Sequence, residues 1–254
     1  MPPELTHLSY SSISAYLGCG QAWHYKYVQH IPTPTAPELV FGSAVHNTVE
    51  RYIQTKQPLL DVWNECWTKQ VESESSIEWG ASTAEEFAND GVRLLGNAKV
   101  QEALAAVAGT CGDTPTVERR IEMYVPGVPI PIIGYIDILD AQGIPGDLKT
   151  SARSWTADRA QSELQSLFYL AALNQLGETV PGWRFKHYVL VKTKTPQFQM
   201  FEHSHNPSEM FWMMGLIQRA WQGIERGVYL MNPDSWKCDA KYCSYYHLCR
   251  GRSA

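Results

Sequence analysis

Two acidic residues and a lysine have a spacing that brings them together on neighbouring strands. Asp137 ends the segment Gly134-Tyr-Ile-Asp137, and Asp147-Leu-Lys149 follows ten positions later. Side chains alternate along a strand, so Asp147 and Lys149 point to one face, and a turn brings Asp137 beside them. Carboxylates bind Mg²⁺ or Mn²⁺, which activates water and neutralises charge on a phosphoryl group. The spacing therefore predicts a hydrolytic metal site in which Lys149 orients the attacking water.

Three more polar side chains are predicted on helices. Gln165 and Tyr169 are four positions apart, so they share one face of a helix, where an amide and a phenol approach a phosphate or a base. An amphipathic helix that buries its apolar stripe is the alternative for this segment. His46 stands early in another predicted helix, where a lone histidine is more often structural than a ligand.

Three cysteines lie close together near the C-terminus. Cys238, Cys243 and Cys249 form a Cys-x4-Cys-x5-Cys pattern. In a reducing compartment, thiolates at this spacing favour a soft metal over disulfides. The candidates for a fourth ligand are Cys19, Cys66, Cys111 and His247. The spacing alone leaves the metal open between an iron–sulfur cluster and zinc, and Cys66 and Cys111 fit ordinary buried thiols.

The elements that must position these groups follow from hydrophobic periodicity. Helices are expected over 9–28, 41–56, 59–71, 85–108 and 160–176, and another after Asn206-Pro-Ser-Glu209. Thr83-x-x-Glu86 is a capping pattern for the fourth helix. Strands are expected over 117–123, 130–139, 144–150, 185–192 and 197–203, the first three as an antiparallel meander. The order predicts an α/β chain with a helical insertion over about residues 57–112.

Length, composition and charge limit the domain count, the location and the class of the protein. With 254 residues, 44% of them hydrophobic, one substantial core and a single domain over 1–254 are expected. No long apolar run or basic leader occurs, so we expect a cytoplasmic protein without membrane association. The net charge of −5 excludes a globally basic nucleic-acid binder but allows a local basic groove. Some of the nine Trp and 13 Tyr are expected to stack on unpaired bases, and most to fill the core.

The motifs, taken in order, resemble the RecB-like branch of the PD-(D/E)XK nuclease superfamily. They are a helical Gly42-x-x-x-His46, a Gly134-x-x-Asp137 strand, an Asp147-x-Lys149 strand and a Gln165-x-x-x-Tyr169 helix. The resemblance implies a restriction-endonuclease-like α/β core, in which helices flank a central mixed sheet. Ile136 stands where the family nominally has Pro. Glu118 resembles an upstream family glutamate, with a solvated strand face as the equal alternative.

The same resemblance implies roles for individual residues. His46, Asp137, Asp147 and the Leu148 carbonyl would bind Mg²⁺ or Mn²⁺. Lys149 would be catalytic together with the two aspartates, and Gln165 and Tyr169 would lie near DNA.

The cysteines carry a second part of the resemblance. Cys19 lies between a serine-rich segment and Trp23, an arrangement similar to the helix that bears the lone N-terminal cysteine of iron–sulfur RecB-like nucleases. Gly20 stands where that family usually has Pro. The resemblance implies a [4Fe-4S] cluster, with Zn²⁺ as the alternative, that clamps the ends of the domain. Its ligands would be Cys19, Cys238, Cys243 and Cys249.

The implied activity is that of a metal-dependent deoxyribonuclease. It would be an exonuclease on DNA ends or single strands, in recombination, repair, phage DNA processing or CRISPR adaptation, in a bacterial, archaeal or phage-infected cell. No Gly-x4-Gly-Lys-[Ser/Thr] motif occurs, so a helicase would be a separate partner, as would a recombinase or integrase.

Two alternatives stand beside this hypothesis. One is a non-cleaving DNA-binding module, against which the intact Asp137, Asp147 and Lys149 argue. The other is a zinc-stabilised interaction protein, which a colourless, zinc-containing preparation would favour.

Overall fold

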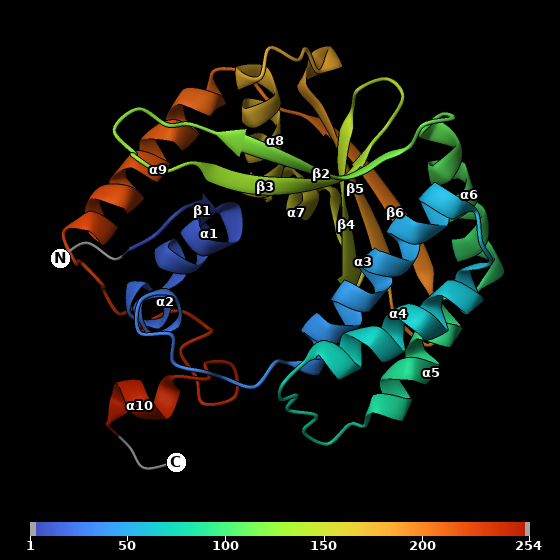
Figure 1. Cartoon of the computed structure of the whole chain (residues 1–254), viewed down its shortest axis with the longest axis horizontal. Coiled ribbons are helices and arrows are strands. Elements are labelled where there is room, and N and C mark those ends of the chain that lie inside the picture. Colours follow the sequence, from blue (N-terminus) through green and yellow to red (C-terminus); the bar gives the residue numbers. More distant parts are fainter. Residues whose placement is uncertain (1–3, 252–254) are drawn as a thin grey trace. The chain divides into compact units, whose positions relative to one another are not determined.

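The computed structural model describes residues 4–251, and their contacts divide the chain into two compact units (Figure 1). Unit 1 comprises Met1–Pro34, Glu122–Gly134 and Ser208–Ala254. Unit 2 comprises Thr35–Ile121 and Tyr135–Pro207. The single domain expected over the whole chain stays a prediction.

Unit 2 contains most of the sheet and all of the predicted helical insertion. Its helices are α3 (Pro37–Thr55), α4 (Leu59–Ser73), α5 (Ala84–Leu95), α6 (Ala98–Thr110), α7 (Ala157–Ser162) and α8 (Leu164–Gln175), with a 3-10 turn, η1, at Pro181–Trp183. Its strands are β4 (Pro145–Ser151), β5 (Arg184–Val191), β6 (Gln197–Ser204) and the larger parts of β2 (Thr116–Met123) and β3 (Ile132–Leu139).

The sheet is mixed. β3 pairs antiparallel with β4, β4 parallel with β5, and β5 antiparallel with β6, while β2 pairs with β3. Leu148 of β4 lies in the hydrophobic core that α3 to α6 build, whereas Lys149, the next residue, points to Gln165 of α8. Because successive side chains point to opposite faces, helices cover both faces of β4 (Figure 1). The predicted mixed sheet flanked by helices is confirmed.

Three predicted helices are each interrupted once. Residues 9–28 form α1 (Tyr10–Gly18) and α2 (Gly20–Tyr27), separated by Cys19 in an extended conformation. Residues 85–108 break before α6, where the Asn97 side chain accepts hydrogen bonds from two backbone N–H groups and starts a new helix. Residues 160–176 break at Glu163, which is also extended. Apolar periodicity did not detect these breaks, because they leave the apolar stripe of each segment in place.

The ends of the other elements agree closely with those predicted from the sequence. The capping box of Thr83 and Glu86 is present at the start of α5, as predicted. α3 begins at Pro37 rather than residue 41, since proline suits the first turn of a helix.

Unit 1 joins the first and last parts of the chain. It contains β1 (Leu8–Ser9), α1, α2, α9 (Glu209–Glu225) and α10 (Tyr246–Arg250), and β1 pairs in parallel with the start of β3. Neither β1 nor α10 was predicted, because both are too short to show a period. Three side-chain hydrogen bonds tie residues 16–31 to residues 228–245: Tyr16 to the Val228 carbonyl, Asn232 to the Gly18 carbonyl and Tyr245 to the Ile31 carbonyl. Within the described chain, no helix has the length and apolar character needed to span a bilayer.

Gly20 allows this joining because it has no side chain. A Cβ atom at this position would lie 2.9 Å from the Leu230 nitrogen and 3.1 Å from two Tyr229 backbone atoms. We expect Gly20→Ala to lower the free energy of unfolding by about 1–3 kcal/mol, because backbone atoms cannot move aside cheaply. Urea denaturation measures this loss. Gly18→Ala is the control, since nothing lies within 4 Å of its added Cβ, and equal losses in both variants would contradict the close packing at Gly20.

Candidate active site and cysteine group

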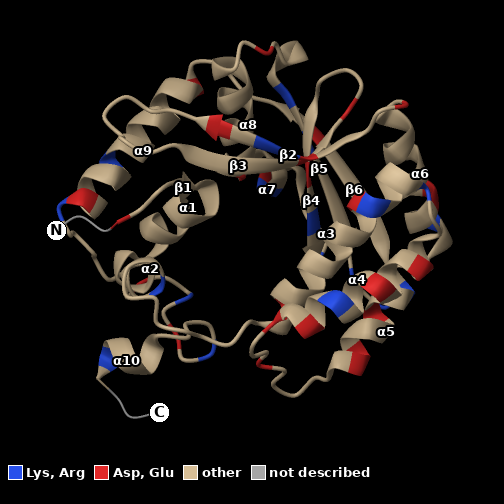
Figure 2. Cartoon of the chain, in the orientation of Figure 1, with Lys and Arg blue, Asp and Glu red and all other residues tan. Residues whose placement is uncertain are grey.

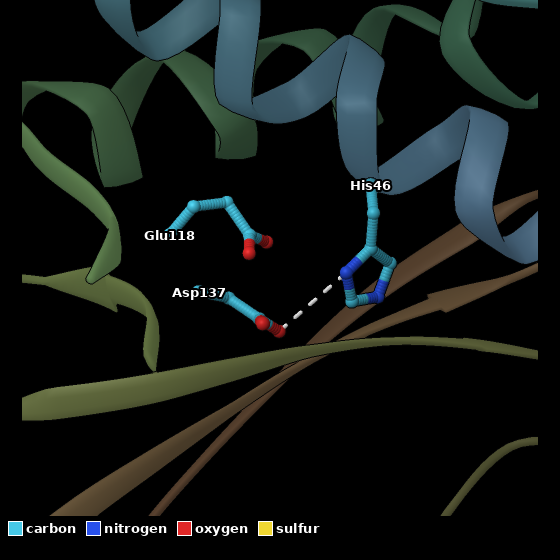
Figure 3. Close-up of side chains that lie close together, drawn as sticks. All are labelled: His46, Glu118 and Asp137. Atoms are coloured by element: carbon cyan, nitrogen blue, oxygen red, sulfur yellow. Dashed lines mark ion pairs between the residues drawn. The ribbon is translucent and has the colours of Figure 1, made fainter. Parts of the chain in front are cut away.

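Three side chains from separate elements of unit 2 converge on one point. His46 comes from α3, Glu118 from β2 and Asp137 from β3, and one ligand atom of each lies within 4.8 Å of the other two. Figure 3 shows the imidazole and the two carboxylates directed toward one another. His46 Nδ1 and Asp137 Oδ2 are 3.6 Å apart. Carboxylate oxygens with one imidazole nitrogen are donors that can hold a divalent metal ion.

The Asp147 segment adjoins this group. The Leu148 backbone N–H donates to Asp137 Oδ2 at 2.6 Å. Asp147 is only 1% exposed, and its Oδ2 atom has no hydrogen-bond partner among the described residues. A buried carboxylate oxygen without a partner is costly, and a bound cation would relieve that cost.

Lys149 is fixed by two hydrogen bonds. Its Nζ atom donates to Asp147 Oδ1 at 2.7 Å and to Gln165 Oε1 at 2.9 Å. Gln165 Nε2 in turn donates to the hydroxyl oxygen of Tyr169 at 2.7 Å. Burial by itself would lower the pKa of Lys149, but the surrounding carboxylates, with Asp147 first among them, together outweigh burial and raise it. The side chain is therefore an ammonium held in one place by β4 and α8.

The electrostatics of the site favour a cation. Burial, and then the Asp147 carboxylate, raises the pKa of Asp137 to about 8. Partial burial, followed by Asp137 and Glu50, raises the pKa of Glu118 to about 7. Burial lowers the pKa of His46, so its imidazole is neutral, the form that binds metal. Crowded carboxylates that resist ionisation are the expected state of a cation site without its ion.

Two acidic residues of this site were not firmly predicted from the sequence: Glu118 had an equal alternative, and Glu50 was not predicted. Glu118 has a φ of 48° within β2, a left-handed conformation that is strained for a residue other than glycine and typical of functional positions. Strand alternation cannot reveal such a backbone. Glu50, one helical turn after His46 on α3, raises the pKa of Glu118. Its i,i+4 spacing from His46 was the available signal.

The other predicted site is in unit 1. Cys19, Cys238, Cys243 and Cys249 interact electrostatically: burial raises the pKa of Cys243, and the other three thiols raise it further. All four are free and partly exposed, whereas Cys66 and Cys111 are buried, Cys111 in the hydrophobic core of unit 2. The fold thus brings Cys19 beside the three C-terminal cysteines.

The fold and the first site together define a class. A mixed sheet that gathers two aspartates and a lysine on adjacent strands, beside a helical histidine, is the core of a metal-dependent nuclease. Residues 7–250 match the PD-(D/E)XK nuclease superfamily, and the chain belongs to it.

A solved crystal structure shows the same fold. The crystal structure of a Eubacterium rectale protein described as "Putative exonuclease" aligns with a TM-score of 0.63 at 11% identity, covering 98% of this chain and 89% of that one. The structure of SSO0001 aligns over 96% of both chains at 12% identity, but its TM-score of 0.35 supports no argument. No protein with a curated description matches this sequence.

Proposed function

We propose that this chain is a metal-dependent deoxyribonuclease that acts as an exonuclease on DNA ends or single strands. The observation that carries the proposal is the state of Asp147. One of its oxygens holds the Lys149 ammonium, and the other is buried with no hydrogen-bond partner within residues 4–251, next to the group of His46, Glu118 and Asp137. A cation site and a fixed ammonium are the two requirements for hydrolysing a phosphodiester near neutral pH.

Each residue then has a proposed role. The cation, Mg²⁺ or Mn²⁺, would be held by His46, Asp137, Asp147 and the Leu148 carbonyl, with Glu118 as a further ligand. When bound, it would supply an activated water and neutralise charge on the phosphate. Lys149 orients the attacking water. Gln165 and Tyr169, proposed to lie near DNA, also fix the Lys149 ammonium through their hydrogen bonds.

The cysteine group is proposed to hold a [4Fe-4S] cluster. The mutual proximity of the four partly exposed thiols supports this assignment, as does their arrangement of one N-terminal and three C-terminal ligands. Zn²⁺ is the alternative. Brown colour with absorbance near 400 nm would identify the cluster, whereas a colourless protein that contains zinc would identify the alternative.

For the biological setting, we propose a group of DNA-processing pathways rather than a single one. Recombination, repair, phage DNA processing and CRISPR adaptation all require the trimming of DNA ends, with a helicase, recombinase or integrase as a separate partner. The name of the Eubacterium rectale protein agrees with an exonuclease. A non-cleaving DNA-binding protein on the same fold is less well supported, because Lys149 and both aspartates are in place.

A nuclease assay tests the activity directly. Single- and double-stranded DNA, labelled at either end, is incubated with Mg²⁺ or Mn²⁺, and the products are resolved by length. We expect nucleotide-sized or short products from the ends. Fragments cut only internally from a circular substrate would contradict the exonuclease, and intact DNA under every condition would contradict the nuclease.

We expect cation binding to strengthen as pH rises from 6 to 9. With pKa values of about 8 for Asp137 and about 7 for Glu118, both carboxyls hold protons at pH 6, and a cation must displace them. Affinity for Mn²⁺ should rise by up to about tenfold per pH unit for each displaced proton. Titration calorimetry in buffers of different ionisation enthalpy measures both the affinity and the protons released.

The same pKa values set the stability of the metal-free protein. Because they lie above the ordinary carboxyl range, their contribution to stability is complete only below the unfolded-state pKa of about 4 and is lost progressively as pH rises to about 7 to 8. Mn²⁺ should therefore raise the melting temperature more at pH 8.5 than at pH 6. Equal shifts at both pH values would contradict the proposed ligands.

A further inference from the structure

Exposed aromatic rings with adjacent cations occur in the C-terminal part of unit 1. Trp236 is 70% exposed and Tyr242 is 56% exposed, and their rings meet edge to face with centroids 5.3 Å apart. Lys237 Nζ lies 5.5 Å from the Trp236 ring centroid, and Lys241 Nζ lies 5.5 Å from that of Tyr242. Single exposed rings are ordinary, but a contiguous exposed set marks a binding surface.

The pattern continues in the neighbouring elements. The Arg250 guanidinium lies 5.5 Å from the Tyr246 ring in α10, and Lys26 lies 5.3 Å from the Tyr27 ring in α2. In these segments, four aromatic rings thus have a cation beside them. The cation can contact a phosphate while the ring stacks on a base.

The distribution of positive charge also favours the binding of a polyanion in this region. Residues 226–251 contain four Lys or Arg and two Asp, although the whole chain has 21 Lys and Arg against 26 Asp and Glu. By contrast, residues 57–112 contain nine Asp or Glu and three Lys or Arg, and acidic residues are prominent on α4 and α5 (Figure 2). An acidic chain that keeps a local positive excess is suited to a polyanion at that place.

We infer that Trp236, Lys237, Lys241 and Tyr242 form a binding site for single-stranded DNA, named here the tail platform. Trp236 and Tyr242 stack on unpaired bases, and the two lysines contact the flanking phosphates. Exposed rings favour unpaired DNA over duplex because bases within a duplex are already stacked on each other. Charge complementarity favours DNA over a protein partner. The inference rests on the proposed function, because it assigns a second binding region to the same substrate.

The test measures DNA binding by the full-length protein purified without oxygen. Fluorescence anisotropy follows a fluorescein-labelled oligothymidine and a duplex of equal length, without added Mg²⁺ or Mn²⁺. We expect Trp236→Ala and Tyr242→Ala each to weaken oligothymidine binding by about fivefold to a hundredfold, with a smaller effect on the duplex. Trp212→Ala is the matched control, because Trp212 is an exposed tryptophan of α9 in the same unit and should bind as the wild type does.

A second variant tests the role of the lysines and keeps both rings. Lys237→Ala/Lys241→Ala should reduce the slope of log Kd against log salt by about 0.7 for each phosphate that a lysine no longer neutralises. Iron and zinc per chain, measured for every variant, show that the cysteine group is intact.

The outcomes are distinct. Wild-type affinity in the ring and lysine variants would overturn the tail platform, as would an equal loss in Trp212→Ala. Wild-type cleavage of DNA with Mg²⁺ separates this failure from that of the proposed function. If the wild type cleaves DNA and the ring variants bind normally, only the platform is wrong, whereas a wild type that neither binds nor cleaves DNA overturns both.

Discussion

Asp147→Asn and Lys149→Ala should each lower the rate of DNA cleavage by about 10³-fold or more. Asp147 is buried, bonds Lys149 through one oxygen and has its other oxygen free for a cation. Asn keeps the shape of the side chain but loses the charge that both partners need. Lys149→Ala removes the ammonium that β4 and α8 hold in place. Both groups act mainly in the transition state, so DNA binding should change far less than turnover.

Single-turnover cleavage of end-labelled DNA measures the rate, and anisotropy measures binding in the same variants. Asp61→Asn is a matched control, since Asp61 is an exposed residue in the first turn of α4. Melting temperatures show whether a variant is folded, and Lys149→Arg distinguishes geometry from charge, because it keeps a cation in a different shape. Turnover near that of the wild type in either Asp147→Asn or Lys149→Ala would refute the assignment.

Cys19→Ala should release iron and destabilise the protein by several kcal/mol. A cluster that joins Cys19 to Cys238, Cys243 and Cys249 closes a loop of nearly the whole chain. By analogy with disulfides, such a closure restricts the unfolded ensemble by about 4–5 kcal/mol. This amount is comparable to the net stability of a typical domain. The hydrogen bonds that tie residues 16–31 to residues 228–245 would then have to hold unit 1 together by themselves.

Cys66→Ala and Cys111→Ala are the matched controls, because both thiols are buried in unit 2, away from the cysteine group. Each should keep the iron content and brown colour of the wild type, with only a packing loss in stability. Iron and zinc per chain are measured on protein purified without oxygen, alongside urea denaturation. If Cys19→Ala keeps its full metal content while a control variant loses it, the ligand assignment is wrong.

Several features could be predicted from the sequence because they depend on local spacing. Asp147 and Lys149 share a face because strand side chains alternate, and Gln165 lies one turn from Tyr169 because helices repeat every 3.6 residues. The capping box at Thr83 and the antiparallel pairing of β3 with β4 are confirmed for the same reason. The order of the motifs indicated the superfamily to which the chain belongs.

Other features depend on contacts between segments distant in sequence, which no local period encodes. The left-handed conformation of Glu118, with φ at 48°, is one such feature, since strand alternation does not encode it. The raised pKa values of Asp137 and Glu118 arise from burial and from charges on other elements.

The sequence by itself determined which residues can do chemistry, because residue type and short-range spacing fix donor atoms and faces. Only the tertiary structure decided which of them meet. It placed Glu118 in the charge environment of His46 and Glu50, left one Asp147 oxygen buried without a hydrogen-bond partner in the described part of the chain, and brought Cys19 beside the C-terminal cysteines. The physical reason is that burial and long-range packing set the electrostatic cost of each group, and both exist only after the chain has folded.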